Sequence, residues 1–367
     1  MIILHAAPVT DGQITGHRVS VPSLVSAQNR LKGVRAGLVM TVPDGKEPCG
    51  ADFPVFPRET LFDDGGRICL APPFDAPDLV VFHSTYVPFH ATTAARLRKA
   101  AIPYVICPRG GMSRYAQRHR WLKKRIGNLL FFRRMVAHAA AVHCLTEHEA
   151  AATQGWGRPL FVVGNGTQLP PAAELAAPGQ SARLRMVFVG RLAIDHKGLD
   201  LLLDACARMR PQLLERGVRV ELYGPDHRSG AKILADRAAR LQLENVVALN
   251  QPVSGAAKVS LLSRTDVFLH TSRAEGHPMA VLEALAFGIP CLVTPGTNVA
   301  EEVAAAAAGW SVEGSAAGIA EGLGRILRED AAGLRRRGAN ARKLAAERYG
   351  WPDVAARTVE AYRRYAA

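Results

Sequence analysis

The stretch LHTSRAEGHPMAVLEALAFGIPCLVTPGTNVAE, residues 269–301, decides the fold of this chain. The apolar run at residues 266–270 is typical of a buried strand. After Pro278, residues 279–287 carry apolar side chains at helical spacing and a glycine follows them, which indicates where a helix begins and ends. Residues 289–294 are mainly apolar again. The stretch therefore predicts a strand, a loop, a helix and a second strand of a parallel sheet.

Two glutamates, Glu275 and Glu283, lie eight residues apart within this unit. Glu275 falls in the loop before the predicted helix, and Glu283 falls inside the helix. Side chains on a helix lean toward its N-terminus, so both carboxylates are expected near the carboxyl end of the preceding strand. Ligands bind at that edge in open α/β sheets, and the free N–H groups of the helix start suit a phosphate. The alternative is a pair of acids that face solvent on a surface helix.

A second pattern lies in residues 186–204, MVFVGRLAIDHKGLDLLLD. It predicts a strand that ends at Gly190, with Arg191 directly after it, and a helix that begins after Lys197 and Gly198. Such cations are suited to hold a diphosphate, because arginine offers a planar fork of donors and lysine a mobile charge. The alternative is two solvated surface cations.

Together these patterns resemble the C-terminal domain of retaining glycosyltransferases of family 4, which have the GT-B fold. Four motifs in register carry the resemblance: Gly190-Arg191, Lys197-Gly198, the E-x7-E pair Glu275 and Glu283, and the segment from Thr294 to Glu301. The resemblance is specific over residues 183–303 and looser in the N-terminal half. It implies an α/β fold of GT-B architecture, with two Rossmann-like doubly wound domains facing across a deep cleft.

The resemblance also implies roles for single residues. Arg191 and Lys197 would stabilise the leaving diphosphate, and Glu275 would lie close to the donor sugar, without being named a nucleophile or a general base. Glu283 would hold the ribose hydroxyls. The donor-binding set that the resemblance implies is Gly190, Gly276, His277, Pro278, Met279, Glu283 and Thr294.

The length of 367 residues predicts two domains, each with its own core. We expect an N-terminal acceptor-binding Rossmann-like domain at residues 1–168 and a C-terminal domain that binds the nucleotide sugar at residues 169–350. The polar, turn-rich segment at residues 165–181 is the expected linker. The amphipathic residues 351–367 form a last helix, which the resemblance implies packs back on the N-terminal domain.

Composition excludes several classes of protein. A hydrophobic content of 48% and a mean hydropathy of +0.03 are typical of a globular chain. The apolar runs fall short of the roughly 20 residues that a transmembrane helix needs. The six cysteines are scattered and contain no CxxC pair, which favours a reducing cytoplasm over a disulfide framework or a zinc site.

The net charge of +14 is concentrated in one segment. Between Asp78 and Glu147 there are twelve basic residues and no acid, and eight of the twelve lie within residues 114–134, interleaved with leucines and aromatics. This mixture indicates a helix on an anionic membrane, where each cation contributes about 1 kcal/mol. No nucleic-acid-binding motif accompanies the charge, so nucleic acid is not the expected partner. The alternative is a solvated basic helix face.

With the family resemblance, this segment predicts a lipid-linked or glycan acceptor, such as an undecaprenyl-diphosphate-linked sugar. The expected process is assembly of a bacterial surface polysaccharide: exopolysaccharide, capsule, or the O-antigen of lipopolysaccharide. The expected location is the cytoplasm, peripherally at the inner face of the plasma membrane.

Three N-terminal residues follow predicted strands and are candidates for the acceptor side: Gly16, His83 and Arg109. Gly16 follows the predicted strand at residues 1–5, in a loop that also contains Asp11, Gly12 and Thr15. His83 follows the predicted strand at residues 79–82, and Arg109 follows the one at residues 104–107. Many relatives have His-Gly where this chain has Arg109-Gly110, which leaves open the residue that touches the transferred sugar. Arg109 could instead bind an acceptor phosphate. The alternative for His83 is a structural role.

No D-x-D triplet occurs, so we expect no metal site, no cofactor, and a UDP-sugar or GDP-sugar donor whose diphosphate the cations neutralise. Two other classes remain open: a GT-B sugar-nucleotide epimerase, which needs no acceptor, and a non-catalytic membrane-associated scaffold. The Gly-Arg, Lys-Gly and E-x7-E motifs argue against the epimerase. A scaffold would have no use for two carboxylates beside a diphosphate site.

Overall fold

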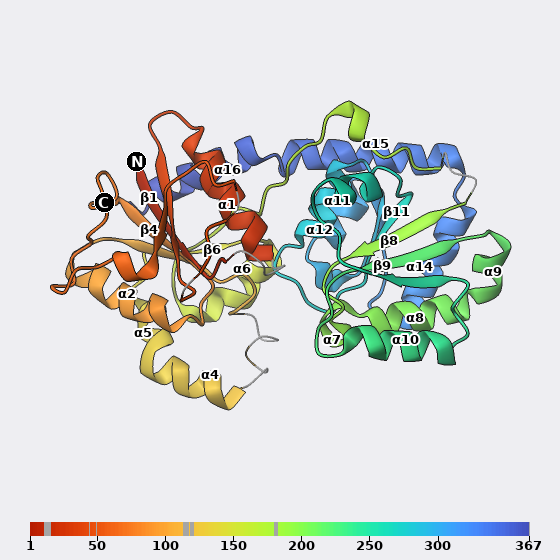
Figure 1. The fold of residues 1–367 in the computed structure, drawn as a ribbon, viewed down its shortest axis with the longest axis horizontal. Helices are drawn as coiled ribbons and strands as arrows, with labels where there is room; N and C mark the ends of the chain where they lie inside the picture. Colours follow the sequence, from red (N-terminus) through yellow and green to blue (C-terminus); the bar gives the residue numbers. More distant parts are fainter. Residues whose placement is uncertain are drawn as a thin grey trace. The chain divides into compact units, whose positions relative to one another are not determined.

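The computed structural model describes residues 1–10, 16–43, 45–48, 50–112, 117, 121–179 and 183–366. These residues form two compact units (Figure 1). Unit 1 contains Met1–Gly166 and Trp351–Ala367, and unit 2 contains Thr167–Gly350. Each unit has a parallel sheet with helices packed on both faces. The predicted α/β fold of two doubly wound domains is confirmed.

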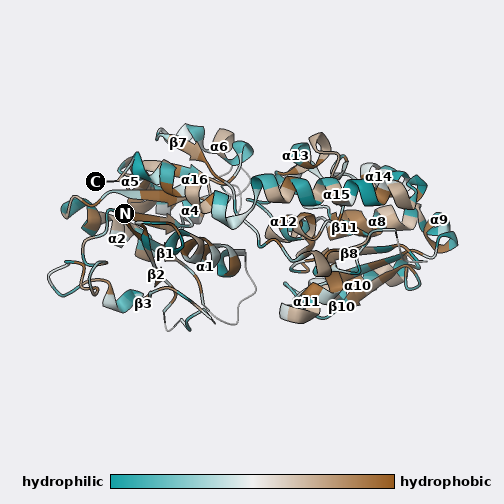
Figure 2. Ribbon diagram, turned by 90° about the horizontal axis from the view of Figure 1, so that it is seen from above, coloured by the Kyte–Doolittle hydropathy of each residue, from teal (hydrophilic) through white to brown (hydrophobic). Residues whose placement is uncertain are grey.

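The sheet of unit 1 has seven parallel strands in the order β3-β2-β1-β4-β5-β6-β7. The strands are β1 (Ile2–Ala7), β2 (Arg35–Met40), β3 (Val55–Pro57), β4 (Leu79–His83), β5 (Tyr104–Cys107), β6 (Ala141–Cys144) and β7 (Leu160–Val162). Successive side chains enter opposite cores, so Leu4 and Val80 face one and Ile3 and Leu79 face the other. Because both faces are covered, the central strands are nearly continuous apolar runs, brown in Figure 2.

Helices α1 (Gly16–Asn29) and α16 (Trp351–Arg363) cover one face of this sheet. The other face is covered by α2 (Pro88–Lys99), α5 (Arg133–Ala137) and α6 (Glu147–Thr153). The strand order reverses at β1, which lies between β2 and β4. In doubly wound sheets, ligands bind at the carboxyl ends of strands at such a switch point. Residues that follow β1, β4 and β5 are therefore candidates for a binding site.

Helix α16 completes the core of unit 1 although it follows unit 2 in the chain. Tyr362 is fully buried, and its hydroxyl oxygen lies 3.0 Å from Nδ1 of His143 on β6. Val359 and Tyr362 share one apolar cluster with Val21 and Val25 of α1. Without this helix, the face of the sheet beside α1 would lose much of its cover.

The sheet of unit 2 has six parallel strands in the order β10-β9-β8-β11-β12-β13. They are β8 (Arg185–Val189), β9 (Arg219–Tyr223), β10 (Val247–Asn250), β11 (Val267–His270), β12 (Cys291–Val293) and β13 (Gly309–Ser311). One face packs on α8 (Leu199–Arg208), α10 (Gly230–Arg240) and α14 (Ala316–Arg328). The other packs on α11 (Gly255–Leu262), α12 (Met279–Ala286), α13 (Ala300–Ala305) and α15 (Ala331–Arg348).

Helix α12 has well-defined ends. Pro278, where the sequence predicted the helix to begin, is its N-cap residue with an extended backbone, and the helix itself begins one residue later at Met279. At the other end, Gly288 has a φ of +75° and donates to the carbonyl of Leu285 at 2.9 Å, while Ile289 donates to that of Ala284 at 3.0 Å. This is the Schellman ending that glycine favours. It turns the chain at once into β12.

The predicted linker is not a free connection. In its described part, Thr167 donates to the carbonyl of Tyr349 at 2.6 Å, Ala176 donates to that of Phe287 at 2.9 Å, and Gly179 donates to Asp266 Oδ1 at 2.7 Å. Residues 167–179 therefore lie along the surface of unit 2. Residues 180–181 of the predicted linker lie outside the described residues.

The basic segment is helical where the structure describes it. Helix α4 (Trp121–Gly127) runs into a π-helical turn, η2 (Asn128–Phe132), and then into α5. Residues 114–116 and 118–120 and the side chain of Lys123 lie outside the described residues. In the part of the chain that is described, no helix has the length and apolar character needed to cross a membrane.

Candidate active site

The carboxyl ends of β8 and β11 meet through closely packed loops. Gly190 follows β8 and donates to the carbonyl of Tyr223 at 2.9 Å. A Cβ atom on Gly224 would lie 1.7 Å from the Gly190 oxygen, so only glycine fits there. Arg191 comes next and is exposed. The backbone of the two loops thus fixes the position from which Arg191 extends.

Lys197 ends the short helix α7 (Ile194–Lys197), and Gly198 follows it with a φ of +62°. A Cβ on Gly198 would lie 2.2 Å from the carbonyl oxygen of Thr271, the residue after β11. The Thr271 hydroxyl in turn donates to the carbonyls of Lys197 and Gly198, at 3.2 Å each. This close approach brings Lys197 to the loop that carries Glu275.

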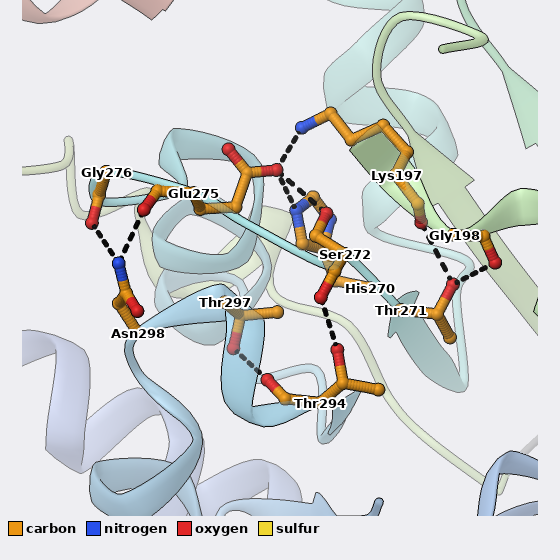
Figure 3. A network of polar contacts seen from close by, with 10 residues as sticks. All are labelled: Lys197, Gly198, His270, Thr271, Ser272, Glu275, Gly276, Thr294, Thr297 and Asn298. Carbon is orange, nitrogen blue, oxygen red and sulfur yellow. Dashed lines mark hydrogen bonds and ion pairs between the residues drawn. The ribbon is translucent and has the colours of Figure 1, made fainter. Parts of the chain in front are cut away.

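One carboxylate oxygen of Glu275 gathers three partners (Figure 3). Its Oε1 atom forms an ion pair with the Lys197 ammonium, accepts a hydrogen bond from Ser272 Oγ at 2.8 Å, and lies 3.1 Å from His270 Nε2. The side chains of Lys197 and Glu275 are each 12% exposed. The arrangement is an almost buried ion pair.

The surroundings of Glu275 keep its carboxylate ionised. Burial alone would raise its pKa, but the Lys197 ammonium and the hydrogen bond from His270 outweigh burial and hold the pKa well below the usual 4.5. Burial lowers the pKa of His270, so its ring is neutral and donates from Nε2 to Glu275. Glu275 is therefore suited to face positive charge and unsuited to give up a proton.

The loop that holds Glu275 is supported by residues after β12 (Figure 3). The amide of Asn298 donates to the carbonyls of Glu275 and Gly276. The buried hydroxyl of Thr294 donates to the Ser272 carbonyl at 2.8 Å. Thr294 and Asn298 thus set the path of the chain before α12.

Glu283 lies in α12 and forms a separate ion pair with Lys258 of α11. These two side chains are 21% and 25% exposed. His277 is buried, and its ring meets that of Tyr349 edge-on with centroids 5.5 Å apart. Met279 begins α12 and packs partly on the core.

In unit 1, two of the three acceptor candidates are in contact. His83 ends β4 and is fully buried, and Arg109 follows β5 with a φ of +50°. Arg109 Nε donates to His83 Nδ1 at 3.2 Å. Gly16 is the exposed first residue of α1, and the preceding Asp11, Gly12 and Thr15 lie outside the described residues.

The sequence predicted Lys197 and Glu275 as site residues, and the structure brings them together. The sequence did not predict His270, Ser272, Asn298 or Lys258 as site residues. The polar run His270-Thr271-Ser272 after an apolar strand was a usable signal, because polar residues at a strand's carboxyl end often face a ligand. Lys258 had no such signal. In the described part of the chain, no group of three or more His, Cys, Asp or Glu side chains is arranged to hold a metal ion.

Two family descriptions match the chain. Residues 178–344 match the glycosyl transferases group 1, and residues 15–166 match the glycosyl transferase 4-like domain. HepE from Anabaena, solved with UDP and glucose, superposes with a TM-score of 0.73 at 18% identity over 99% of this chain and 100% of that one. This likeness shows a shared fold.

Two of the curated relatives that match in sequence illustrate the similarity. WcaL of Salmonella typhimurium, a glycosyltransferase assigned to colanic acid biosynthesis, is 32% identical over 164 residues, 43% of this chain and 39% of WcaL. The MMP alpha-(1->4)-mannosyltransferase of Mycolicibacterium hassiacum is 27% identical over 248 residues, 66% of this chain and 56% of the relative. The chain thus matches about two-fifths and just over half of these relatives' own length. With both family matches and the site motifs in one chain, the protein belongs to the group 1 glycosyltransferases of family 4.

Proposed function

We propose that this protein is a retaining glycosyltransferase that moves a sugar from a UDP-sugar or GDP-sugar to a glycan or lipid-linked acceptor in bacterial surface polysaccharide assembly. The observation that carries the proposal is the ion pair of Lys197 and Glu275, with His270 and Ser272 on the same oxygen. The assignment of WcaL to colanic acid biosynthesis supports the polysaccharide, and UDP in HepE supports a nucleotide donor. Retention of configuration is carried over from the family resemblance.

The leaving group of the reaction is a nucleoside diphosphate, on which negative charge grows in the transition state. The exposed Arg191 extends from the loop after β8 and Lys197 from the end of α7, and both stabilise that charge. Lys197 has three N–H donors, so its ammonium can bind a phosphate oxygen while it contacts Glu275.

The sugar carbon becomes positive as the diphosphate departs. Glu275, ionised because of its depressed pKa, faces that charge and stabilises it. Glu283 binds the ribose hydroxyls, and Lys258 holds the Glu283 carboxylate in place. Gly276, His277 and Pro278 form the turn that leads from Glu275 to α12, and Met279 begins the helix that carries Glu283.

Transfer is metal-independent in this proposal, since Lys197 and Arg191 do the neutralising that a divalent cation does in other transferases. Addition of EDTA to the purified protein should leave the transfer rate within about twofold, and abolished transfer that Mg²⁺ or Mn²⁺ restores would overturn this part.

Residues 121–134, which we call the basic apolar segment, are proposed to bind the anionic surface of the membrane that carries the acceptor. Six large apolar side chains in it are 52–82% exposed: Trp121, Leu122, Ile126, Leu129, Leu130 and Phe131. An exposed apolar patch of this kind marks an interaction surface. The basic Lys124, Arg125, Arg133 and Arg134 lie among them, which matches anionic headgroups.

The test of the donor site is calorimetry with UDP, GDP, ADP and their common sugars, without metal. One nucleotide should bind in the micromolar range and lose affinity in Arg191→Ala, whose melting temperature serves as the folding control. Product analysis with that nucleotide's sugar and lipid-linked acceptors then tests transfer. Turnover of the nucleotide sugar without any acceptor into an epimer would replace the transferase by an epimerase.

A further inference from the structure

A directed chain of hydrogen bonds runs through unit 1 beneath the carboxyl ends of its strands. Arg109 Nε donates to His83 Nδ1 at 3.2 Å. His83 Nε2 lies 2.8 Å from His5 Nδ1, and His5 Nε2 lies 2.7 Å from Gln28 Oε1. His5 and Gln28 are fully buried, as is His83.

The donors in this chain can be assigned from its ends. Because arginine only donates, His83 Nδ1 must accept, and His83 therefore carries its proton on Nε2 and donates to His5. His5 accepts at Nδ1 and donates from Nε2 to the Gln28 oxygen. Both rings are thus neutral. Burial also favours the neutral rings, because it lowers the pKa of His5 to about 4 and that of His83 well below 6.5.

The other contacts of Arg109 are also neutral. Its Nη1 donates to Ser20 Oγ at 2.9 Å and to Asn165 Oδ1 at 3.2 Å. Glu149 interacts with Arg109 electrostatically, but its two carboxylate oxygens accept hydrogen bonds from the backbone N–H groups of Gly110 and Leu145. No described carboxylate bonds the guanidinium, and no described residue bonds its Nη2 atom.

The result is a fixed, half-buried guanidinium whose charge has no bonded counter-ion among the described residues. It lies at the carboxyl ends of β4 and β5, beside the switch point of the sheet. A planar guanidinium held in this way matches the oxygens of a phosphate or a carboxylate.

We propose that Arg109 binds an anionic group, a phosphate or a carboxylate, on the sugar acceptor, and that His83 and His5 are positioning residues that hold the guanidinium. The assignment of the anion to the acceptor rests on the proposed transferase function. The binding of an anion by Arg109 does not depend on the proposed transferase function.

The experiment uses the full chain with Arg191→Gln and Lys197→Gln, so that the donor site does not compete for anions. Inorganic phosphate, glucuronate and neutral glucose are titrated against it by ligand-observed NMR. The loss of a charge-assisted hydrogen bond predicts an affinity about tenfold lower or more in the further variant Arg109→Gln. Arg35→Gln is the matched control, because Arg35 is an exposed arginine at the opposite, amino-terminal edge of the same sheet.

Phosphate binding that depends on Arg109 identifies a phosphorylated acceptor, and glucuronate binding that depends on it identifies an acidic sugar. Equal affinity in Arg109→Gln, or no binding of either anion to the parent, overturns the proposal. Nucleotide binding by the wild-type chain is measured separately. Its absence would remove the transferase function and leave the anion result standing.

The positioning role has its own readout. His83→Gln keeps an acceptor for Arg109 and a donor for His5, whereas His83→Leu has neither. Anion affinity should be retained in His83→Gln and fall about threefold or more in His83→Leu, by loss of one hydrogen bond. Equal affinities in two folded variants would show that His83 does not orient Arg109.

Discussion

His270 Nε2 lies 3.1 Å from Glu275 Oε1, the same oxygen that meets Lys197 and Ser272. No described residue bonds the other carboxylate oxygen, Oε2. One oxygen of Glu275 therefore anchors the side chain, and in the proposed function the other is available to a ligand. The neutral histidine orients the carboxylate without cancelling its charge.

Glu275→Gln should lower the turnover number about 10²–10³-fold, because the amide keeps the shape of the side chain but cannot stabilise developing positive charge. Binding of the nucleotide should change by less than about threefold. Initial rates and calorimetry measure the two effects. Glu244→Gln, an exposed acid of unit 2, is the control. Full turnover in Glu275→Gln would remove this residue from the chemistry.

Lys197→Met should raise the pKa of Glu275, since Lys197 contributes most to lowering it and burial then acts without that opposition. The wild-type carboxylate should stay ionised below pH 4.5, whereas in Lys197→Met it should take up a proton at higher pH. Because its pKa is depressed in the folded state, the ionised carboxylate stabilises the wild-type fold above about pH 4.5, and this contribution is lost as the pH falls.

Carbon NMR of labelled glutamate carboxyls measures this titration, with Glu275→Gln to assign the signal. Lys232→Met, which removes a lysine that is 77% exposed, should leave it unchanged. An unshifted Glu275 titration in Lys197→Met would show that the ion pair does not set its charge.

The pair Leu129→Asp and Leu130→Asp should weaken binding to anionic vesicles about tenfold or more. The leucines are 82% and 58% exposed, and each is worth about 1.5–3 kcal/mol when buried in an apolar phase. Flotation with phosphatidylglycerol vesicles measures the effect. Ile233→Asp, at an apolar residue of unit 2 that is 47% exposed, should bind as wild type. No flotation of the wild type at moderate salt would overturn membrane binding.

Tyr362→Ala should destabilise unit 1 by about 3–5 kcal/mol, the usual cost of removing a buried aromatic ring. Tyr362→Phe should cost about 1–3 kcal/mol, because it leaves Nδ1 of buried His143 without its donor. Urea unfolding followed by circular dichroism measures both. Arg363→Ala, at the exposed neighbour on the same helix, should have little effect. A wild-type midpoint in Tyr362→Ala would show that α16 adds little to the core.

The apolar run at residues 79–82 predicted the central strand β4, which the structure extends by one residue to His83, since a strand buried on both faces is apolar nearly throughout. The sequence did not predict the edge strands Val55–Pro57 and Gly309–Ser311, because a proline in the first and a glycine and a serine in the second interrupt the apolar run. Periodicity also cannot show which polar side chains meet. Lys258 and Glu283 are 25 residues apart in the chain, and only the packing of α11 beside α12 joins them.

The ion pair of Lys197 and Glu275 couples the two ends of the bond that the proposed reaction breaks. As the departing diphosphate gains charge, it draws the ammonium toward itself and away from the carboxylate. Glu275 then faces the sugar with less of its charge compensated, at the moment when the anomeric carbon becomes most cationic. Movement of the single Lys197 side chain would thus link departure of the diphosphate to stabilisation of the cationic sugar by Glu275, without transfer of a proton.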